Sequence, residues 1–346
     1  MSEQNFQQQI LKSFIEWMAL APSAHNSQPF QVASNGADFV VKINHRGLLP
    51  KADPSGKELH VGLGCLIAVW EICLHSLNQK IIQFRWQQDG ATRADQVVAR
   101  FQVAAIEIGK AVGVGQQESQ KLKDRLENRF SYRAGFGQNE IDLFVAARDS
   151  LAIKSANSHL IRDEEVFDWV SSHYDRINCT SLMSPGYIEE LYRWMRFSQS
   201  HPRWAFDGLN EEAIGLKPME AIGASLLLNP KVFRRLVKWG FFSKIFSERS
   251  KIFQSVGLWV ITIGEGANWI EKGKMFLTEW LVLQDWNLVG APLSILLDDP
   301  AIQEELKNKL KIPKGREIVN ILRVGPAPTG YIRYKPARKP SSECVP

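Results

Sequence analysis

The sequence predicts an α+β fold, made of one large or two fused units. Segments with the three-to-four spacing of helices alternate with short strand-like segments along the chain. One pair of strands is joined through Asn35-Gly36, a dipeptide typical of a tight antiparallel hairpin. The length of 346 residues exceeds that of most single domains. We therefore expect ample length for a buried core.

The first part of the chain begins with an amphipathic segment that Pro22 ends. The predicted helices span about residues 6–21 and 57–77, and the predicted strands span residues 30–33, 39–43, 81–86 and 97–104. The glycine-rich residues 109–115 are a plausible linker. They contain GVG but lack the third glycine of the dinucleotide-binding fingerprint, so they do not predict a Rossmann unit.

The second part repeats the mixture of helices and strands. Helices are predicted at residues 118–126, 140–147 and 164–176, and strands at residues 158–161, 258–263, 293–297 and 318–324. Gly64, Leu74 and Asn78 of the long apolar helix recur 209 residues later as Gly273, Leu283 and Asn287. The recurrence is explained either by chance or by an ancient duplication.

Composition indicates a soluble globular protein. Hydrophobic residues make up 45% of the chain and charged residues 23%, and no uninterrupted apolar run approaches the length of a membrane span. The polar N-terminus lacks the order of a signal peptide, so we expect a cytoplasmic protein. The four cysteines form no CxxC pair and no cluster at metal-ligand spacing, which predicts free, mostly buried thiols and no metal site.

The net charge of +5 is unevenly distributed. Residues 231–251 hold seven basic residues and one acidic residue, interleaved with aromatic residues. Such a stretch is compatible with a membrane-surface helix, a nucleic-acid patch, or a lid over a binding site.

Two short motifs carry the functional signal. PSAHNSQP at residues 22–29 is a polar loop between two prolines, and RFSYR at residues 129–133 places two guanidinium groups and a hydroxyl on one side of an extended segment. Arginine in such a pattern favours bidentate binding of a phosphate. Read alone, the first motif is equally compatible with a loop that caps the preceding helix through Ser23 and Asn26.

With these motifs, the chain resembles the FMN-dependent nitroreductase superfamily, in particular its long, internally duplicated branch of mycobacterial Acg-like proteins. The resemblance is carried by APSAHNSQPF, DPSGKELHVGLGC, NRFSYRAGF and IPKGREIVNILRVGPAP, and by EELYRWMRFSQ followed by DGL. It implies a nitroreductase-like fold of two fused halves, residues 1–115 and 116–346, each with helices packed on a mostly antiparallel sheet.

The resemblance also implies a set of flavin contacts. Arg129 and Ser131 would reach the phosphate and ribityl chain of FMN, and Arg133 would lie near N1 and O2 of the ring. The first half would supply the ring-edge contacts Pro22, Ser23, His25 and Asn26, and backbone N–H groups of Gly290 and Ala291 would approach N5 and O4. Gly290 is equally compatible with a helix C-cap. In the C-terminal ARKP, Arg338 and Lys339 would add to the phosphate site, the alternative being a solvated basic tail.

Each motif occurs once, so the resemblance implies one FMN per chain, in a fused pseudo-dimer with one intact site. It implies an NADH- or NADPH-dependent oxidoreductase that reduces a small-molecule acceptor such as a nitroaromatic or quinone, with the flavin and no side chain carrying the chemistry. The alternative is a protein that stores FMN beneath a closed lid, expected at about residues 200–255. A peripheral membrane or nucleic-acid binder is the third hypothesis. We expect no nucleic-acid partner and no integral membrane segment, and homo-oligomerisation stays open.

Overall fold

A computed structural model describes residues 3–86, 97–105, 116–147, 153–238, 247–327 and 337–346. The first unit forms a four-stranded antiparallel sheet in the order β1-β2-β4-β3. Its elements are α1 (Glu3–Met18), β1 (Phe30–Asn35), β2 (Asp38–Ile43), α2 (Lys57–Ser76), β3 (Gln79–Trp86) and β4 (Val97–Ala105). Asn35 pairs with Asp38 and Gly36 has a φ of 63°, so the predicted hairpin is confirmed.

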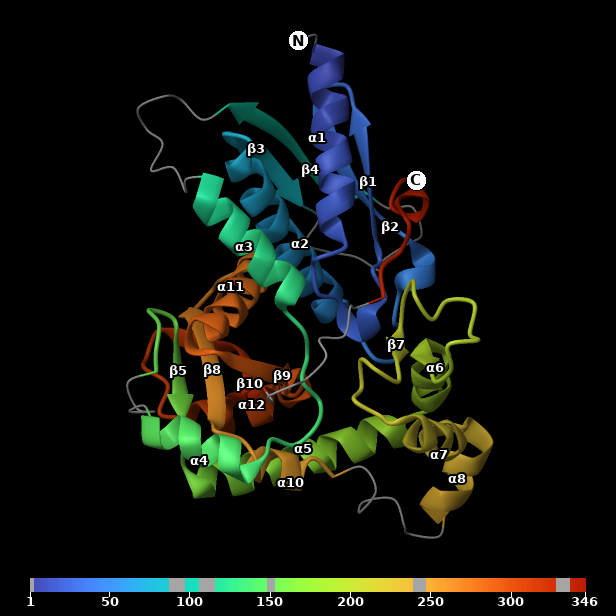
Figure 1. Ribbon diagram of the computed structural model, residues 1–346, viewed down its shortest axis with the longest axis vertical. Coiled ribbons are helices and arrows are strands. Elements are labelled where there is room, and N and C mark those ends of the chain that lie inside the picture. Colours follow the sequence, from blue (N-terminus) through green and yellow to red (C-terminus); the bar gives the residue numbers. More distant parts are fainter. Residues whose placement is uncertain (1–2, 87–96, 106–115, 148–152, 239–246, 328–336) are drawn as a thin grey trace.

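The second unit has a sheet of the same order. Strands β5 (Ser158–Ile161), β8 (Gly257–Gly264), β10 (Arg316–Pro326) and β9 (Leu288–Pro292) lie side by side and antiparallel, as β1, β2, β4 and β3 do. Its helices are α4 (Gln138–Ala147), α11 (Trp269–Val282) and α12 (Pro300–Lys309). Figure 1 shows the first unit in the upper part of the molecule and the second in the lower part. The predicted α+β class, with helices packed on antiparallel sheets, is confirmed.

Helices α2 and α11 pack against each other where the two units meet. A Cβ atom on Gly64 would lie 2.3 Å from the Ile270 carbonyl oxygen, and one on Gly273 would lie 2.1 Å from the Val61 carbonyl oxygen. Residues 61 and 270 are 209 apart, as are the two glycines, so the contact is nearly symmetric. Asn78 and Asn287, also 209 apart, both have a φ of 55° just before the following strand. The recurrence seen in sequence therefore coincides with equivalent positions in the two units.

Residues 162–256 are an insertion between β5 and β8, where the first unit has only the turn between β1 and β2. The insertion contains α5 (Glu164–Met183), α6 (Tyr187–Trp194), β6 (Met195–Arg196), β7 (Leu209–Asn210), α7 (Pro218–Leu228), α8 (Pro230–Lys238) and α10 (Arg249–Phe253). It has a small hydrophobic cluster of its own, made by Leu182, Ile188, Leu228 and Phe233. Figure 1 shows α6, α7 and α8 at the lower right edge of the molecule.

Two further segments tie the units together. Helix α3 (Gln116–Asn128) follows the first unit and packs on α2 and α11. The C-terminal residues return to the first unit, where the Val32 N–H donates to the Cys344 carbonyl at 2.9 Å, and Figure 1 shows the C-terminus beside β1 and β2. The linker predicted at residues 109–115 lies outside the described residues.

One predicted strand is wrong. Residues 293–297 do not extend the sheet, because Ser294–Leu297 forms a short 3-10 helix. The strand lies earlier, at Leu288–Pro292, and begins directly after the left-handed residue Asn287. Hydrophobicity alone does not separate a buried strand from a buried helical turn.

The cysteines and the apolar helix agree with a packed interior. All four cysteines are free thiols, and the described residues contain no group of three or more His, Cys, Asp or Glu residues placed to hold a metal. Helix α2 is long and apolar enough to cross a membrane by length and composition, but 72% of its apolar window is buried inside the protein. Its apolar residues are therefore accounted for by the core.

Candidate functional site

A cavity of about 750 Å³ opens where the two units and the insertion meet. Such a volume is typical of sites for cofactors and small molecules. Its walls come from the PSAHNSQP loop, the start of α2, the RFSYR segment, α11, the residues after β9, and residues 174–214 of the insertion. Two motifs that lie more than a hundred residues apart in sequence thus face one cavity.

The PSAHNSQP loop has a strained backbone. His25, Asn26 and Gln28 have φ angles of 50°, 52° and 47°, in the left-handed region that residues other than glycine rarely adopt. The Ser23 hydroxyl accepts a hydrogen bond from the Gln28 N–H at 3.0 Å. Strain of this kind persists only where surrounding contacts enforce it, and it is concentrated at functional sites.

Those contacts come from the C-terminal segment and the insertion. The Lys339 ammonium donates to the carbonyls of Ser27 and Gln28 at 2.9 and 2.8 Å. The Asn26 carboxamide donates to the Ala337 carbonyl at 2.9 Å and accepts from Arg338 Nη1 at 3.1 Å. Asn26 therefore lines the cavity while its side chain also holds the loop in shape.

The RFSYR segment places two arginines at the cavity wall. It follows α3 and runs beside β9, where the Tyr132 N–H donates to the Gly290 carbonyl at 3.0 Å. Arg129 is only 7% exposed, with its guanidinium 4.7 Å from the ring centre of Trp280 and its Nη2 donating to the Leu20 carbonyl at 3.2 Å. Burial lowers the pKa of Arg129 to about 10, so it stays charged at neutral pH.

Both arginines have a donor left over. The Nε atoms of Arg129 and Arg133 are buried and have no hydrogen-bond partner among the described residues. A buried unpaired donor is costly, and more so on a charged group. Ser131 lies between the two arginines in the cavity wall. This set of donors suits an anion with several acceptor oxygens, such as a phosphate.

His25 lies in the same wall and is uncharged at neutral pH. Burial, with a further contribution from the nearby Arg133 cation, lowers the pKa of His25 to about 4. Its Nδ1 atom is buried without a hydrogen-bond partner among the described residues. A neutral imidazole with an open nitrogen can exchange hydrogen bonds with the edge of a polar ring.

Two carboxyl groups, Asp53 and Glu58, also line the cavity. Burial raises the pKa of Asp53, and it raises the pKa of Glu58 to about 7. The Lys57 ammonium nearby is paired with Asp298 at 2.8 Å. In DPSGKELH at residues 53–60, the sequence pattern alone predicts no role for either carboxyl group. The available signal was an Asp followed five residues later by a Glu at the start of a helix, but the burial that raises the pKa of both groups is set by the tertiary structure.

Three predicted contacts are not brought to the cavity. Gly290 and Ala291 lie inside β9, paired with Val324 and Arg323 of β10, and the cavity is lined instead by their neighbours Pro292, Ser294 and Ile295. Lys339 is buried behind the loop, because its ammonium is taken up by the two carbonyls that it supports. The other predicted residues, Pro22, Ser23, His25, Asn26, Arg129, Ser131, Arg133 and Arg338, all line the cavity.

The residues of the insertion that line the cavity overlap only the first part of the expected lid, about residues 200–255. The covering residues lie between Tyr174 and Ile214, whereas no described residue of 231–251 lines the cavity. Phe233 is buried in the insertion's own cluster, and Arg234 pairs with Glu189. The aromatic residues Trp239, Phe241, Phe242 and Phe246 lie outside the described residues.

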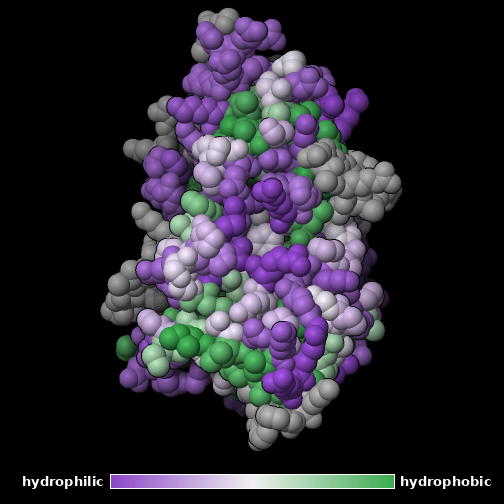
Figure 2. Space-filling model, turned by 90° about the vertical axis from the view of Figure 1, so that its right-hand side faces the viewer, coloured by the Kyte–Doolittle hydropathy of each residue, from purple (hydrophilic) through white to green (hydrophobic). Residues whose placement is uncertain are grey.

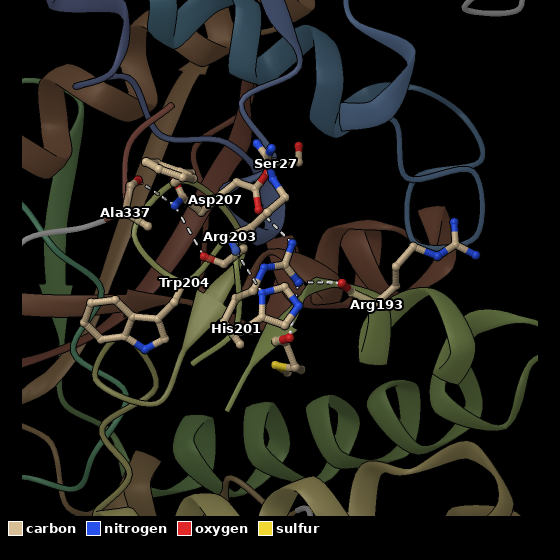
Figure 3. A network of polar contacts seen from close by, with 12 residues as sticks. Ser27, Arg193, His201, Arg203, Trp204, Asp207 and Ala337 are labelled. Atoms are coloured by element: carbon tan, nitrogen blue, oxygen red, sulfur yellow. Dashed lines mark hydrogen bonds and ion pairs between the residues drawn. The ribbon is translucent and has the colours of Figure 1, made fainter. Parts of the chain in front are cut away.

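A buried ionic network fastens this covering segment to the rest of the protein. Figure 3 shows Arg203 and Asp207 at its centre. Asp207 accepts from Arg196 Nη2 at 2.7 Å and from Arg203 Nε at 2.6 Å, and Arg203 also forms a bidentate pair with Glu343 of the C-terminal segment. In addition, the Gln28 side chain donates to the Phe206 carbonyl at 2.9 Å. The loop, the covering segment and the C-terminus therefore form one connected unit.

Comparisons with known proteins give a weak likeness to flavoproteins. A scan against models of known protein families found no match, and neither did a search of curated proteins. Among solved structures, the chain is similar to the FMN- and NADPH-dependent nitroreductase NfnB from sphigopyxis sp. strain HMH, with 14% identity, 65% of this chain and 97% of that chain covered, and a TM-score of 0.33.

Two further structures show the same level of similarity. The FMN-dependent nitroreductase NfnB from Mycobacterium smegmatis, solved in complex with NADPH, is 12% identical over 60% of this chain and 88% of that chain, with a TM-score of 0.31. An iodotyrosine deiodinase bound to FMN and 3-iodo-L-tyrosine is 14% identical over 62% of this chain and 93% of that chain, with a TM-score of 0.29. At these values the function has to be argued from the residues of this chain.

Proposed function

We propose that this chain is an FMN-binding oxidoreductase of the nitroreductase type, with one FMN in the cavity between the PSAHNSQP loop and the RFSYR segment. The observation that carries the proposal is the pair of buried, unpartnered guanidinium Nε atoms of Arg129 and Arg133, two residues that line a cofactor-sized cavity. A phosphate would accept from Arg129 and a ring edge from Arg133, and no described protein group accepts from either Nε atom.

The remaining walls suit the rest of such a ligand. Phe276, Trp280 and Pro292 line the cavity and give apolar surfaces against which a flat ring packs. The strained loop presents Ser23 and the neutral His25 to a ring edge. Arg133 places a permanent positive charge in the same wall, which would stabilise negative charge on a reduced ring.

When bound, FMN would supply the transfer of a hydride from NADH or NADPH to an acceptor such as a nitroaromatic or a quinone. The chain's own residues would bind and orient the FMN and shield it from water. Arg129 and Ser131 hold the anionic end, the loop sets the position of the ring, and the segment between Tyr174 and Ile214 limits the access of water. We assign no catalytic side chain.

We further propose that the chain is a fused pseudo-dimer of residues 1–115 and 116–346. The common strand order of the two sheets and the reciprocal contact of Gly64 and Gly273 support a duplication. RFSYR belongs to the second unit and PSAHNSQP to the first, so one complete site results.

A second candidate function is the storage of FMN, and the ionic network favours it. Asp207 is buried together with Arg196, and the bidentate Arg203–Glu343 pair attaches the same segment to the C-terminus. A covering segment held in this way would restrict the entry of NADH, NADPH or an acceptor. Anaerobic addition of NADH or NADPH separates the two functions, because bleaching of the flavin absorbance within minutes requires access, and its absence supports storage.

The binding proposal is tested by comparing FMN with riboflavin, which lacks the phosphate. We expect the wild-type protein to prefer FMN, and Arg129→Gln to lower FMN affinity about 10- to 100-fold with little change for riboflavin, as expected for the loss of a charge-assisted contact. Leu143→Ser, at a 71% exposed position on α4, is the control. A protein that binds neither flavin, or an Arg129→Gln variant that binds FMN as well as wild type, would refute the proposal.

A further inference from the structure

Helix α7 carries an apolar face that the protein leaves uncovered. Met219, Ile222 and Leu226 are 78%, 57% and 62% exposed, and their spacing of three and four residues places them on one side of the helix. A Cβ atom on Gly223, which continues the same side, would meet nothing within 4 Å. Exposed apolar stripes of this kind mark interaction surfaces in soluble proteins.

The next helix adds positive charge beside that face. The apolar side of α8 is turned inward, where Phe233 and Val237 pack with Leu228 and Ile188. Its basic residues Lys231, Arg234 and Arg235 are exposed on the outer side. Figure 2 shows an apolar band low on this face of the molecule, with hydrophilic residues directly beside it.

Much of this charge is uncompensated. Glu189 pairs with Arg234, but among the described residues no carboxylate pairs with Lys231, Arg235 or the exposed Lys217 before α7. The nearby Glu220 carboxylate accepts the Lys217 N–H at 2.8 Å and so is placed at the start of the helix. The surface therefore combines an exposed apolar stripe with three cations that pair with no carboxylate in the described part of the chain.

We propose that the α7–α8 face is a docking site for an anionic phospholipid membrane surface. The apolar stripe would enter the boundary between headgroups and acyl chains, and Lys217, Lys231 and Arg235 would contact the anionic headgroups. Charge complementarity favours a lipid surface over a second copy of this chain, which would bring like charges together. The exposed apolar stripe favours it over nucleic acid, whose backbone attracts cations but offers no apolar layer.

The proposal is tested by co-sedimentation of the full chain with vesicles. We expect the protein to pellet with phosphatidylcholine vesicles that contain one third phosphatidylglycerol, weakly or not at all with phosphatidylcholine alone, and less at high salt. Ile222→Asp should lower the partition coefficient at least about tenfold, since it replaces an apolar side chain that would enter the bilayer by a charged one. Lys231→Gln and Arg235→Gln should each lower it about fivefold.

The control is Leu143→Asp, which changes a leucine that is 71% exposed on a different helix, α4. Thermal unfolding confirms that the variants are folded, which their exposure leads us to expect. The proposal is overturned by an absence of binding to the anionic vesicles, or by Ile222→Asp binding as well as Leu143→Asp. It is also overturned if Ile222→Asp converts a dimer to a monomer, or if duplex DNA competes and the Ile222→Asp change leaves DNA binding intact.

Discussion

Replacing Gly64 by alanine tests the contact that joins the two units. The new Cβ would lie 2.3 Å from the Ile270 carbonyl oxygen and 2.8 Å from the Gly273 Cα, and both are backbone atoms of α11. Side-chain rotation therefore gives no relief, and the two helices have to separate. Because α2 and α11 both line the cavity, through Gly62 and Trp280, the separation would reach the candidate site.

The magnitude follows from two opposing terms. Overpacking of a core contact costs about 1–3 kcal/mol, and more where the backbone must move. Alanine in place of glycine within a helix raises the free energy of unfolding by up to about 1 kcal/mol through its higher helix propensity. Since the contact is between backbones, we expect the free energy of unfolding to fall by about 2–3 kcal/mol for Gly64→Ala and by a similar amount for Gly273→Ala.

The assay is urea unfolding followed by tryptophan fluorescence. Gly223→Ala is the matched control, because its Cβ would meet nothing and only the helix-propensity gain of up to about 1 kcal/mol remains. The double variant Gly64→Ala/Gly273→Ala should lose less than the sum of the single losses, because one separation of the helices accommodates both methyl groups. A Gly64→Ala protein as stable as Gly223→Ala, or additive losses, would contradict the reasoning.

Three further predictions concern the site and its supports. Asp207→Asn should lower the free energy of unfolding in urea by about 3–5 kcal/mol, because it leaves the buried Arg196 cation unpaired. Glu343→Gln, at the more exposed end of the network, should lower it by about 1 kcal/mol or less. For Glu58 the folded pKa of about 7 lies above the unfolded value, so its contribution to stability is present below about pH 4.5 and is lost as the pH rises to 7. Between pH 5 and pH 8, the free energy of unfolding of Glu58→Gln should therefore rise by about 1–2 kcal/mol relative to that of wild type in the same assay. This value is reduced because the Glu58 side chain is 26% exposed. A difference between the two proteins that does not change with pH would count against the prediction. Lys339→Met should weaken FMN binding at least about fivefold in flavin titration by removing two hydrogen bonds that hold the strained loop, and unchanged affinity would show that the loop keeps its shape without them.

The element boundaries were largely predictable because they depend on local patterns. The strand at residues 158–161 coincides with β5, and the hairpin at Asn35-Gly36 and the long helix from residue 57 were found within one or two residues. These signals come from periodicity and turn residues, which act over a few positions of the chain. The strand expected at residues 293–297 failed because a short buried apolar run has no such local signature.

The sequence by itself determined the chemistry available to the site. Two arginines around a serine predicted an anion site, since this depends on residue type and spacing, whereas the ring-edge role of the polar loop between prolines was implied by the family resemblance. The tertiary structure decided which of these side chains can contact a ligand in the cavity. Arg338 and Lys339 are neighbours in the chain. Arg338 lines the cavity, whereas the Lys339 ammonium donates its hydrogen bonds to the Ser27 and Gln28 carbonyls of the loop.

The tertiary structure also decided which part of the insertion lines the site and which carboxyl groups are buried. Residues between Tyr174 and Ile214 line the cavity, whereas no described residue of the basic stretch does, and the pKa of Glu58 is raised because the folded protein buries its carboxyl group. The burial and pairing of a side chain are set by contacts between residues far apart in the chain, so the sequence pattern around that residue does not predict them.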